Sequence, residues 1–191
     1  NADLSRITAR HLLNMSSGIA WDENYSNPVS SDVIRMLYSP DGYADMGRFV
    51  CRKPQQRAPG AHLRYSSGDT NLLMAALKHA LRATYSDFPW KELFNRVGMR
   101  SAVWERDASG TFVGSSFVHA SARDFARLGL LYLRGGIWNG ARILPESWIA
   151  FSRALAPAAQ ARDSEEDPYG AAWWLNLGKY PSAPRDMYQA L

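Results

Sequence analysis

The strand signals in this chain are too few for a complete sheet, and this shortage is the feature that most constrains its fold. The segment from Tyr169 to Leu177, with Trp173 and Trp174 inside it, has the apolar and aromatic composition of a β-strand. An unpaired apolar strand exposes its backbone groups and promotes aggregation, so a strand of this kind needs neighbours. We therefore expect the chain to be part of a larger domain.

Helical patterns dominate the rest of the chain. Apolar residues recur three and four positions apart, and most of these stretches begin at a residue that suits a first helical turn. The expected starts are Thr8, for a helix that stops at Gly18, then Asn27-Pro28, Ser67 or Asp69, Pro89, for a short helix that Gly98 ends, Ser121, for a helix over Ala122–Arg134, and Pro145. Val103-Trp104 and Phe112-Val113 flank a turn at Asp107–Gly110 and predict a hairpin.

Composition excludes several classes of function. The net charge is +4, from 22 basic and 18 acidic residues, and it is spread thinly, whereas nucleic-acid-binding domains gather their cations on one stripe. No apolar run approaches the roughly 20 residues that cross a bilayer. The single cysteine, Cys51, and four histidines without ligand spacing predict no metal site. We therefore expect no nucleic acid, no membrane span, no metal and, in the absence of a phosphate-binding glycine loop, no organic cofactor.

One motif carries candidate chemistry. Tyr65, Ser66 and Ser67 stand directly before a predicted helix, where backbone N–H groups are free. That environment, with a nearby cation, lowers the pKa of a phenol and makes phenolate usable as a base. Tyrosines also precede helices as packing residues, so the residues alone leave both interpretations open.

Four blocks, in this order, resemble the serine beta-lactamase and penicillin-binding-protein-like hydrolases. They are Ile7–Gly18, Tyr65-Ser66-Ser67 in the place of that family's Tyr-x-Asn motif, Ser121–Gly129 continued by Gly136–Pro145, and Tyr169-Gly170 before Trp173-Trp174. The chain is most similar to the 6-aminohexanoate-dimer hydrolase and esterase-like branch, in which the third motif residue is often serine. A loop like Trp21–Pro28 also follows the first block in that branch.

The resemblance implies an α+β fold of the beta-lactamase/transpeptidase type, with an antiparallel sheet flanked by helices and a mostly helical lobe. Residues 1–191 would be part of that single domain and would supply much of the lobe. The family's nucleophile lies in a Ser-x-x-Lys motif, and no serine here has lysine three residues later. We therefore expect the nucleophile upstream of Asn1 and a Lys-Thr-Gly-like strand downstream of Leu191, so that this segment alone is inactive.

The resemblance also implies roles for matching positions. Tyr65 would accept the proton of the nucleophile and later help to activate water. Ser67 would hydrogen-bond the substrate amide or the lysine. Tyr25 lies in a loop that borders the active site in this branch, and Trp173 or Trp174 would form an apolar wall. Packing is the alternative for Tyr25, Trp173 and Trp174, because aromatic side chains bury so much area.

The expected function is hydrolysis of a small-molecule ester or amide through an acyl-enzyme. A catalytically silent relative that binds peptides or cell-wall fragments is the alternative, and a purely structural helical module is a third. The resemblance covers esters, linear and cyclic amides, D-peptides and beta-lactams, so it does not identify the substrate. Oligomeric state stays open, as does the compartment, since bacterial relatives include periplasmic and secreted proteins.

Overall fold

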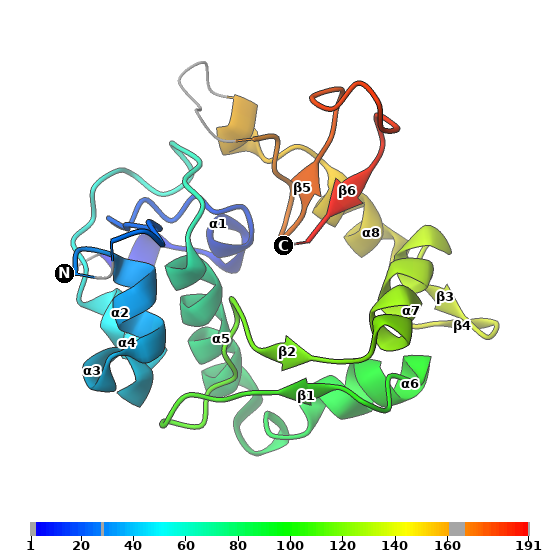
Figure 1. Ribbon diagram of the computed structural model, residues 1–191, viewed down its shortest axis with the longest axis horizontal. Coiled ribbons are helices and arrows are strands. Elements are labelled where there is room, and N and C mark those ends of the chain that lie inside the picture. Colours follow the sequence, from blue (N-terminus) through cyan, green and yellow to red (C-terminus); the bar gives the residue numbers. More distant parts are fainter. Residues whose placement is uncertain (1–2, 28, 161–166, 191) are drawn as a thin grey trace.

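The computed structural model describes residues 3–27, 29–160 and 167–190, and helices carry most of its regular structure (Figure 1). The helices are α1 Ala9–Leu13, α2 Asp32–Tyr38, α3 Pro40–Ala44, α4 Met46–Cys51, α5 Ser67–Leu81, α6 Asn95–Val97, α7 Ala122–Leu133 and α8 Glu146–Arg153. The strands are β1 Val103–Trp104, β2 Val118–His119, β3 Ile137–Trp138, β4 Ala141–Arg142, β5 Trp174–Leu175 and β6 Tyr188–Gln189. Within these described residues, no helix is both long and apolar enough to cross a bilayer.

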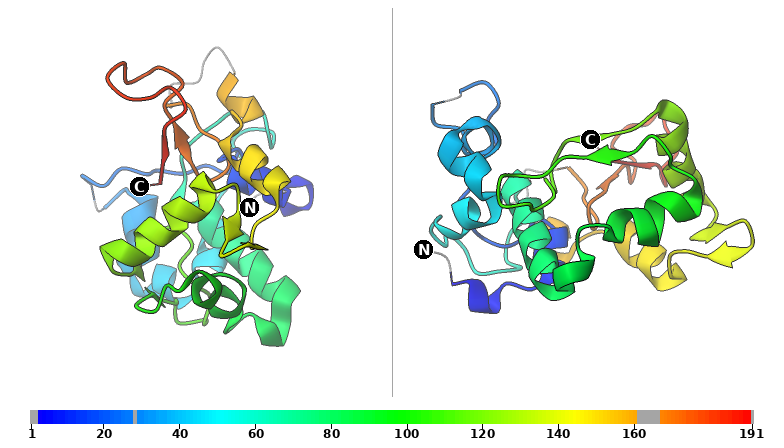
Figure 2. Two further views of the ribbon diagram at one scale, coloured as in Figure 1. Left: turned by 90° about the vertical axis from the view of Figure 1, so that its right-hand side faces the viewer. Right: turned by 90° about the horizontal axis from the view of Figure 1, so that it is seen from below.

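The elements are arranged in a ring in the view of Figure 1. Helices α2 to α4 lie at one end of the long axis and the β3–β4 hairpin lies at the other (Figures 1 and 2). Strands β1 and β2 run between α5 and the group formed by α6 and α7. The first and last parts of the chain come into contact where Asn14 Nδ2 donates to Gly170 O at 2.8 Å and Ala172 N donates to Leu13 O at 3.0 Å. These bonds place the turn after α1 beside the segment that leads to β5.

The first core lies between α2, α4 and α5. Gly47 lets α4 approach α5 closely, since a Cβ at this position would lie 2.5 Å from the Cβ of Ala75. Nine buried apolar residues form this core: Ile19, Trp21, Val33, Met36, Leu37, Met46, Phe49, Val50 and Val113. Trp21 also covers the start of α5, where a Cβ on Gly68 would lie 2.9 Å from its indole ring. This packing holds the loop that follows Trp21 against the N-terminus of α5.

A second core joins α6 and α7. Its buried members are Phe94, Val97, Met99, Ala102 and Leu131. Gly98 ends the helical segment in the left-handed conformation, with φ of 76°, as expected. The turn Asn139-Gly140 closes the β3–β4 hairpin with positive φ at both residues, the conformation that this dipeptide favours.

The three sheets of the described residues are two-stranded and antiparallel, and one of them corrects the strand pairing of the predicted hairpin. Val103 pairs with His119 and Trp104 with Val118, rather than with the segment around Phe112. Phe112 pairs instead with Arg106 through an isolated bridge. The Phe112 ring is completely buried and stacks on Trp104 with 5.0 Å between centroids. The predicted turn at 107–110 does form, since Asp107 N donates to Thr111 O at 2.9 Å and Val113 N to Glu105 O at 3.0 Å.

The starts and ends of three helices differ from those predicted. Helix α5 is capped by Ser66, whose Oγ accepts from Asp69 N at 3.1 Å, rather than by Ser67 or Asp69. Helix α2 begins after the cap Ser31, and Pro28 lies outside the described residues. Helix α1 is capped by Thr8 as expected but ends at Leu13 instead of near Gly18, because Met15 already adopts a left-handed φ of 51°.

The long strand predicted from Tyr169 to Leu177 is reduced to the two residues of β5. Ala172 and Leu177 have positive φ values of 60° and 45°, which interrupt the extended backbone on both sides. The partner of β5 comes from the same chain: Trp174 pairs with Gln189 and Leu175 with Tyr188.

Candidate functional site

Tyr65 lies at the entrance to α5 and packs against aromatic residues from the far end of the chain. Its ring centroid is 4.9 Å from that of Trp174 and 6.0 Å from that of Tyr169. Tyr169 is buried together with Met15 and Leu63 in a small core beneath Tyr65. The hairpin of β5 and β6 therefore supplies an apolar wall for one side of the tyrosine.

Trp173 faces a different environment, because neighbouring residues of extended chain point to opposite sides. Its ring packs against Tyr132 at 4.8 Å and against Tyr188 at 5.1 Å between centroids. Of the two tryptophans proposed as a wall, the structure brings Trp174 to Tyr65 and places Trp173 against α7 and β6.

Glu23 connects two other predicted site residues. Its Oε1 accepts from Ser67 Oγ at 2.6 Å and from the Tyr25 hydroxyl at 2.9 Å. Its Oε2 accepts from Ser67 N at 2.9 Å and from Trp21 Nε1. Ser67 N is one of the free N–H groups of the first helical turn, where a carboxylate is favoured by the helix dipole. Glu23 thus holds the loop of Tyr25 onto the start of α5.

The sequence analysis did not identify Glu23. Two features of the sequence could have indicated it: a glutamate in the loop just before Tyr25, and the predicted helix start at Ser67, whose backbone N–H groups need an acceptor. The two are 44 positions apart in the sequence, and Trp21 packs against Gly68 beside their contact.

The hydroxyls of Tyr25 and Tyr169 are both harder to deprotonate than the hydroxyl of a free tyrosine. Burial of the hydroxyl raises the pKa of Tyr25 to about 12, and the nearby carboxylate of Glu23 contributes to the increase against the opposing hydrogen bond to Ser67. Burial raises the pKa of Tyr169 still further, with smaller contributions from Tyr65 and Asp69. Both phenols therefore stay protonated at neutral pH.

Asp69 is a buried carboxyl group that the sequence analysis treated only as a cap. It is 1% exposed, and it accepts from Ser17 N at 3.2 Å and from Ser17 Oγ at 2.6 Å. Burial raises its pKa to about 7 against the opposing hydrogen bonds from Ser17, and the charge of Glu23 adds to the increase. These bonds fasten the turn after α1 to the first turn of α5, directly behind the tyrosine motif.

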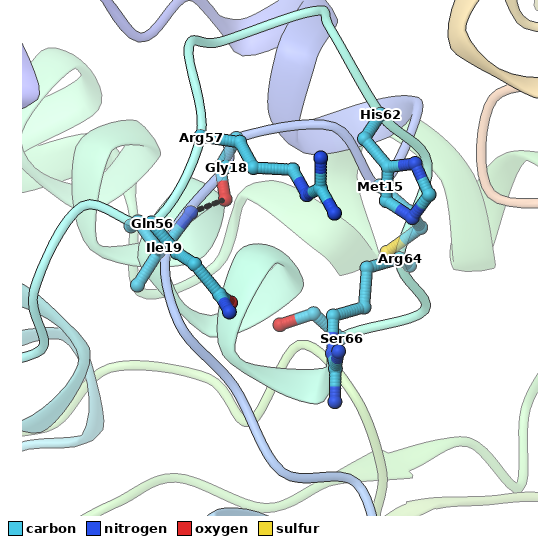
Figure 3. A pocket seen from close by; sticks show the side chains of 9 residues that line it. Met15, Gly18, Ile19, Gln56, Arg57, His62, Arg64 and Ser66 are labelled. Carbon is cyan, nitrogen blue, oxygen red and sulfur yellow. Dashed lines mark hydrogen bonds between the residues drawn. The ribbon is translucent and has the colours of Figure 1, made fainter. Parts of the chain in front are cut away.

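A pocket with a basic lining lies beside this group (Figure 3). It is lined by Met15, Ser17, Gly18, Ile19, Gln56, Arg57, His62, Arg64 and Ser66. Figure 3 shows the side chains of Arg57 and His62 extending into it from opposite sides. None of the predicted site residues lines this pocket, so it is separate from the group around Tyr65 and Ser67.

The described residues provide a phenol, an oriented serine hydroxyl and two carboxyl groups, but no serine paired with lysine in the expected motif. They contain no cluster of three or more histidine, cysteine or acidic side chains that could hold a metal ion. The group therefore offers hydrogen-bonding and proton-transfer side chains, without the serine and lysine of that motif.

Comparison with known proteins places this geometry in a family. The Beta-lactamase family model matches residues 1–188. A Bacillus anthracis protein assigned as a 6-aminohexanoate-dimer hydrolase is similar in structure, with 21% identity, 96% of this chain and 50% of that chain covered, and a TM-score of 0.73. Penicillin binding protein from Bacillus halodurans has 18% identity, coverage of 92% and 58%, and a TM-score of 0.62. D-stereospecific amidohydrolase from Streptomyces sp. has 17% identity, coverage of 91% and 58%, and a TM-score of 0.60.

No curated protein matches the sequence. The chain spans only 50% to 58% of the length of these three solved structures. At identities below 25% their likeness concerns the fold, and it confirms the expected α+β fold of the beta-lactamase/transpeptidase type. Because the family model extends over nearly the whole sequence, the chain belongs to the beta-lactamase family.

Proposed function

We propose that the natural-length protein is a serine hydrolase that cleaves a small-molecule ester or amide through an acyl-enzyme, with its nucleophile outside these 191 residues. The observation that carries the proposal is the placement of Tyr65, Ser67, Tyr25 and Trp174 around the start of α5. In the proposed mechanism Tyr65 takes the proton of the serine nucleophile as the serine attacks the carbonyl carbon. Tyr65 then gives this proton to the alcohol or amine as its bond to the acyl group breaks, so the acyl group stays on the serine. Tyr65 then helps to activate the water that releases the acid.

The remaining residues have supporting roles in this proposal. Ser67 hydrogen-bonds the substrate amide or the lysine of the nucleophile motif. Trp174 forms an apolar wall against which Tyr65 is held, and Tyr25 closes over the substrate. The neighbours named as an aminohexanoate-dimer hydrolase and a D-stereospecific amidohydrolase support amide or ester cleavage as the reaction class.

The test is mass spectrometry of the natural-length protein after reaction with a fluorophosphonate, which labels activated serines. We expect one adduct, on a serine that lysine follows three residues later, and slower labelling in Tyr65→Phe than in the wild type. A folded protein without an adduct would overturn the proposal in favour of a silent protein that binds peptides or cell-wall fragments. Circular dichroism of both variants establishes that the protein tested is folded.

A further inference from the structure

The carboxylate of Glu23 is surrounded by donors on both oxygens. Oε1 accepts from the hydroxyls of Ser67 and Tyr25, and Oε2 accepts from the backbone N–H of Ser67 and the indole N–H of Trp21. An ionised carboxylate offers about four lone-pair sites, so these donors use its full capacity. Within the described residues Glu23 forms no ion pair, which leaves hydrogen bonding as its role.

This arrangement decides the polarity of the Ser67 hydroxyl. A carboxylate can only accept, so the proton of Ser67 Oγ points to Glu23, at a separation of 2.6 Å between the oxygens. The Tyr25 hydroxyl also lies beside Ser67, but it donates its single proton to Glu23, so the lone pairs of the Ser67 oxygen stay able to accept from another group. Ser67 is only 4% exposed, and a hydrogen bond in such a water-poor position discriminates more strongly than one at the surface.

We infer that Glu23 is a positioning residue that presents Ser67 to the substrate as a hydrogen-bond acceptor and so favours amides over esters. This inference rests on the proposed function. A secondary amide has an N–H at the scissile bond that can donate to Ser67, whereas an ester has no such donor. Sites built to hydrogen-bond a substrate group reject analogues that lack it.

Glu23→Gln tests this inference because glutamine has nearly the same shape as glutamate, but an NH2 group, which donates, replaces one of the two accepting oxygens. The Gln oxygen is expected to replace Oε2, since two N–H groups face that position. Its NH2 group then replaces Oε1 and donates to Ser67 Oγ, which turns the serine proton away from residue 23. The variant therefore converts Ser67 from an acceptor to a donor toward the substrate.

The experiment measures kcat/KM of the natural-length protein on a p-nitroanilide and on the p-nitrophenyl ester of the same acid. We expect Glu23→Gln to lower the ratio of amide to ester kcat/KM by about tenfold, the effect of one hydrogen bond. Both substrates are measured on one preparation, so any loss of folded protein cancels in the ratio.

Two backgrounds separate Ser67 from Tyr25, the other hydroxyl on the same oxygen. In Ser67→Ala, Glu23→Gln should leave the ratio unchanged, whereas in Tyr25→Phe it should still lower the ratio. A ratio that does not respond to Glu23→Gln, or that responds equally in Ser67→Ala, overturns the inference while the hydrolase function stands. A wild type with neither turnover nor a fluorophosphonate adduct overturns the proposed function and this inference together.

Discussion

Helices α5 and α7 begin with the same local pattern and differ in what surrounds it. In each, a serine cap is followed three residues later by an aspartate, Ser66 with Asp69 in α5 and Ser121 with Asp124 in α7. Both aspartates are buried and both accept hydrogen bonds from a serine of another segment. The local sequence therefore specifies the same helix start twice.

The electrostatic environments of the two aspartates are opposite. Hydrogen bonds from Ser101 and the guanidinium of Arg127 hold the pKa of Asp124 below its ordinary value. Burial raises the pKa of Asp69 to about 7, and no cation of the described residues forms an ion pair with it. At the start of α7 the carboxylate is stabilised by an ion pair and hydrogen bonds, whereas at the start of α5 the carboxyl group has no ion pair among the described residues and lies beside the candidate site. Perturbed groups of this kind concentrate at functional sites.

The largest effect expected from this difference is on catalysis at α5. Tyr65→Phe removes the proposed base and should lower kcat of the natural-length protein by about 100-fold or more. Stopped or continuous assays with the p-nitrophenyl ester measure kcat, and thermal unfolding establishes that the variant is folded. Unchanged turnover would mean that Tyr65 is a packing residue like Tyr169.

Stability should respond to pH at Asp69. An acid whose pKa is higher in the folded than in the unfolded state makes stability fall as pH rises between the two values, here from about 4 to about 7. A pKa difference of three units limits this loss of folding free energy to about 4 kcal/mol. Asp69→Asn removes the charge and should raise the free energy of unfolding at pH 8 by about 2 kcal/mol. The gain is smaller than the limit because the NH2 end of the amide cannot accept from one of the two Ser17 donors. The variant should show little gain at pH 4.

Asp124→Asn is the matched control for that experiment. It weakens the pairing with Arg127 and Ser101, so it should lower the free energy of unfolding at pH 8 instead of raising it. Urea unfolding of the wild type and both variants at pH 4 and pH 8 measures these changes. Equal shifts in the two variants would contradict the contrast between the helix starts.

The two tryptophans test whether the wall beside Tyr65 is specific. Trp174→Ala removes the ring that packs on Tyr65 and should lower kcat/KM by about tenfold. Trp173→Ala removes a ring that packs against Tyr132 and Tyr188. It should therefore lower the free energy of unfolding and leave kcat/KM nearly unchanged. A larger loss of kcat/KM in Trp173→Ala than in Trp174→Ala would show that Trp173, and not Trp174, forms the wall.

The smallest expected effects come from the caps themselves. Ser66→Ala and Ser121→Ala should each lower the free energy of unfolding by about 1 kcal/mol, since each loses one bond to a first-turn N–H. Only Ser66→Ala should also lower turnover, because Ser66 is next to Tyr65 in the chain. Measuring kcat for both variants distinguishes this effect from the loss of stability that they share. A matching loss of kcat in Ser121→Ala would show that the start of α7 also supports the site.

Local patterns predicted those features that depend on a few neighbouring residues. Ser121 caps α7 as expected, Thr8 caps α1, and Gly98 ends its helix, because each depends on hydrogen bonds or dihedral angles within one turn. The start of α5 was missed by one residue, since Ser66 and Ser67 have the same chemistry and only the three-dimensional position of Glu23 distinguishes them.

The sequence by itself determined the family, the helical character of the chain and the position of Tyr65 before a helix, because ordered motifs and periodic apolar residues are local properties. Tertiary structure alone decided that Trp174 rather than Trp173 contacts Tyr65, and that Glu23 holds Ser67 and Tyr25. The side to which a strand residue points depends on register, and a partner 44 positions away depends on core packing. Neither is encoded within a single turn of chain.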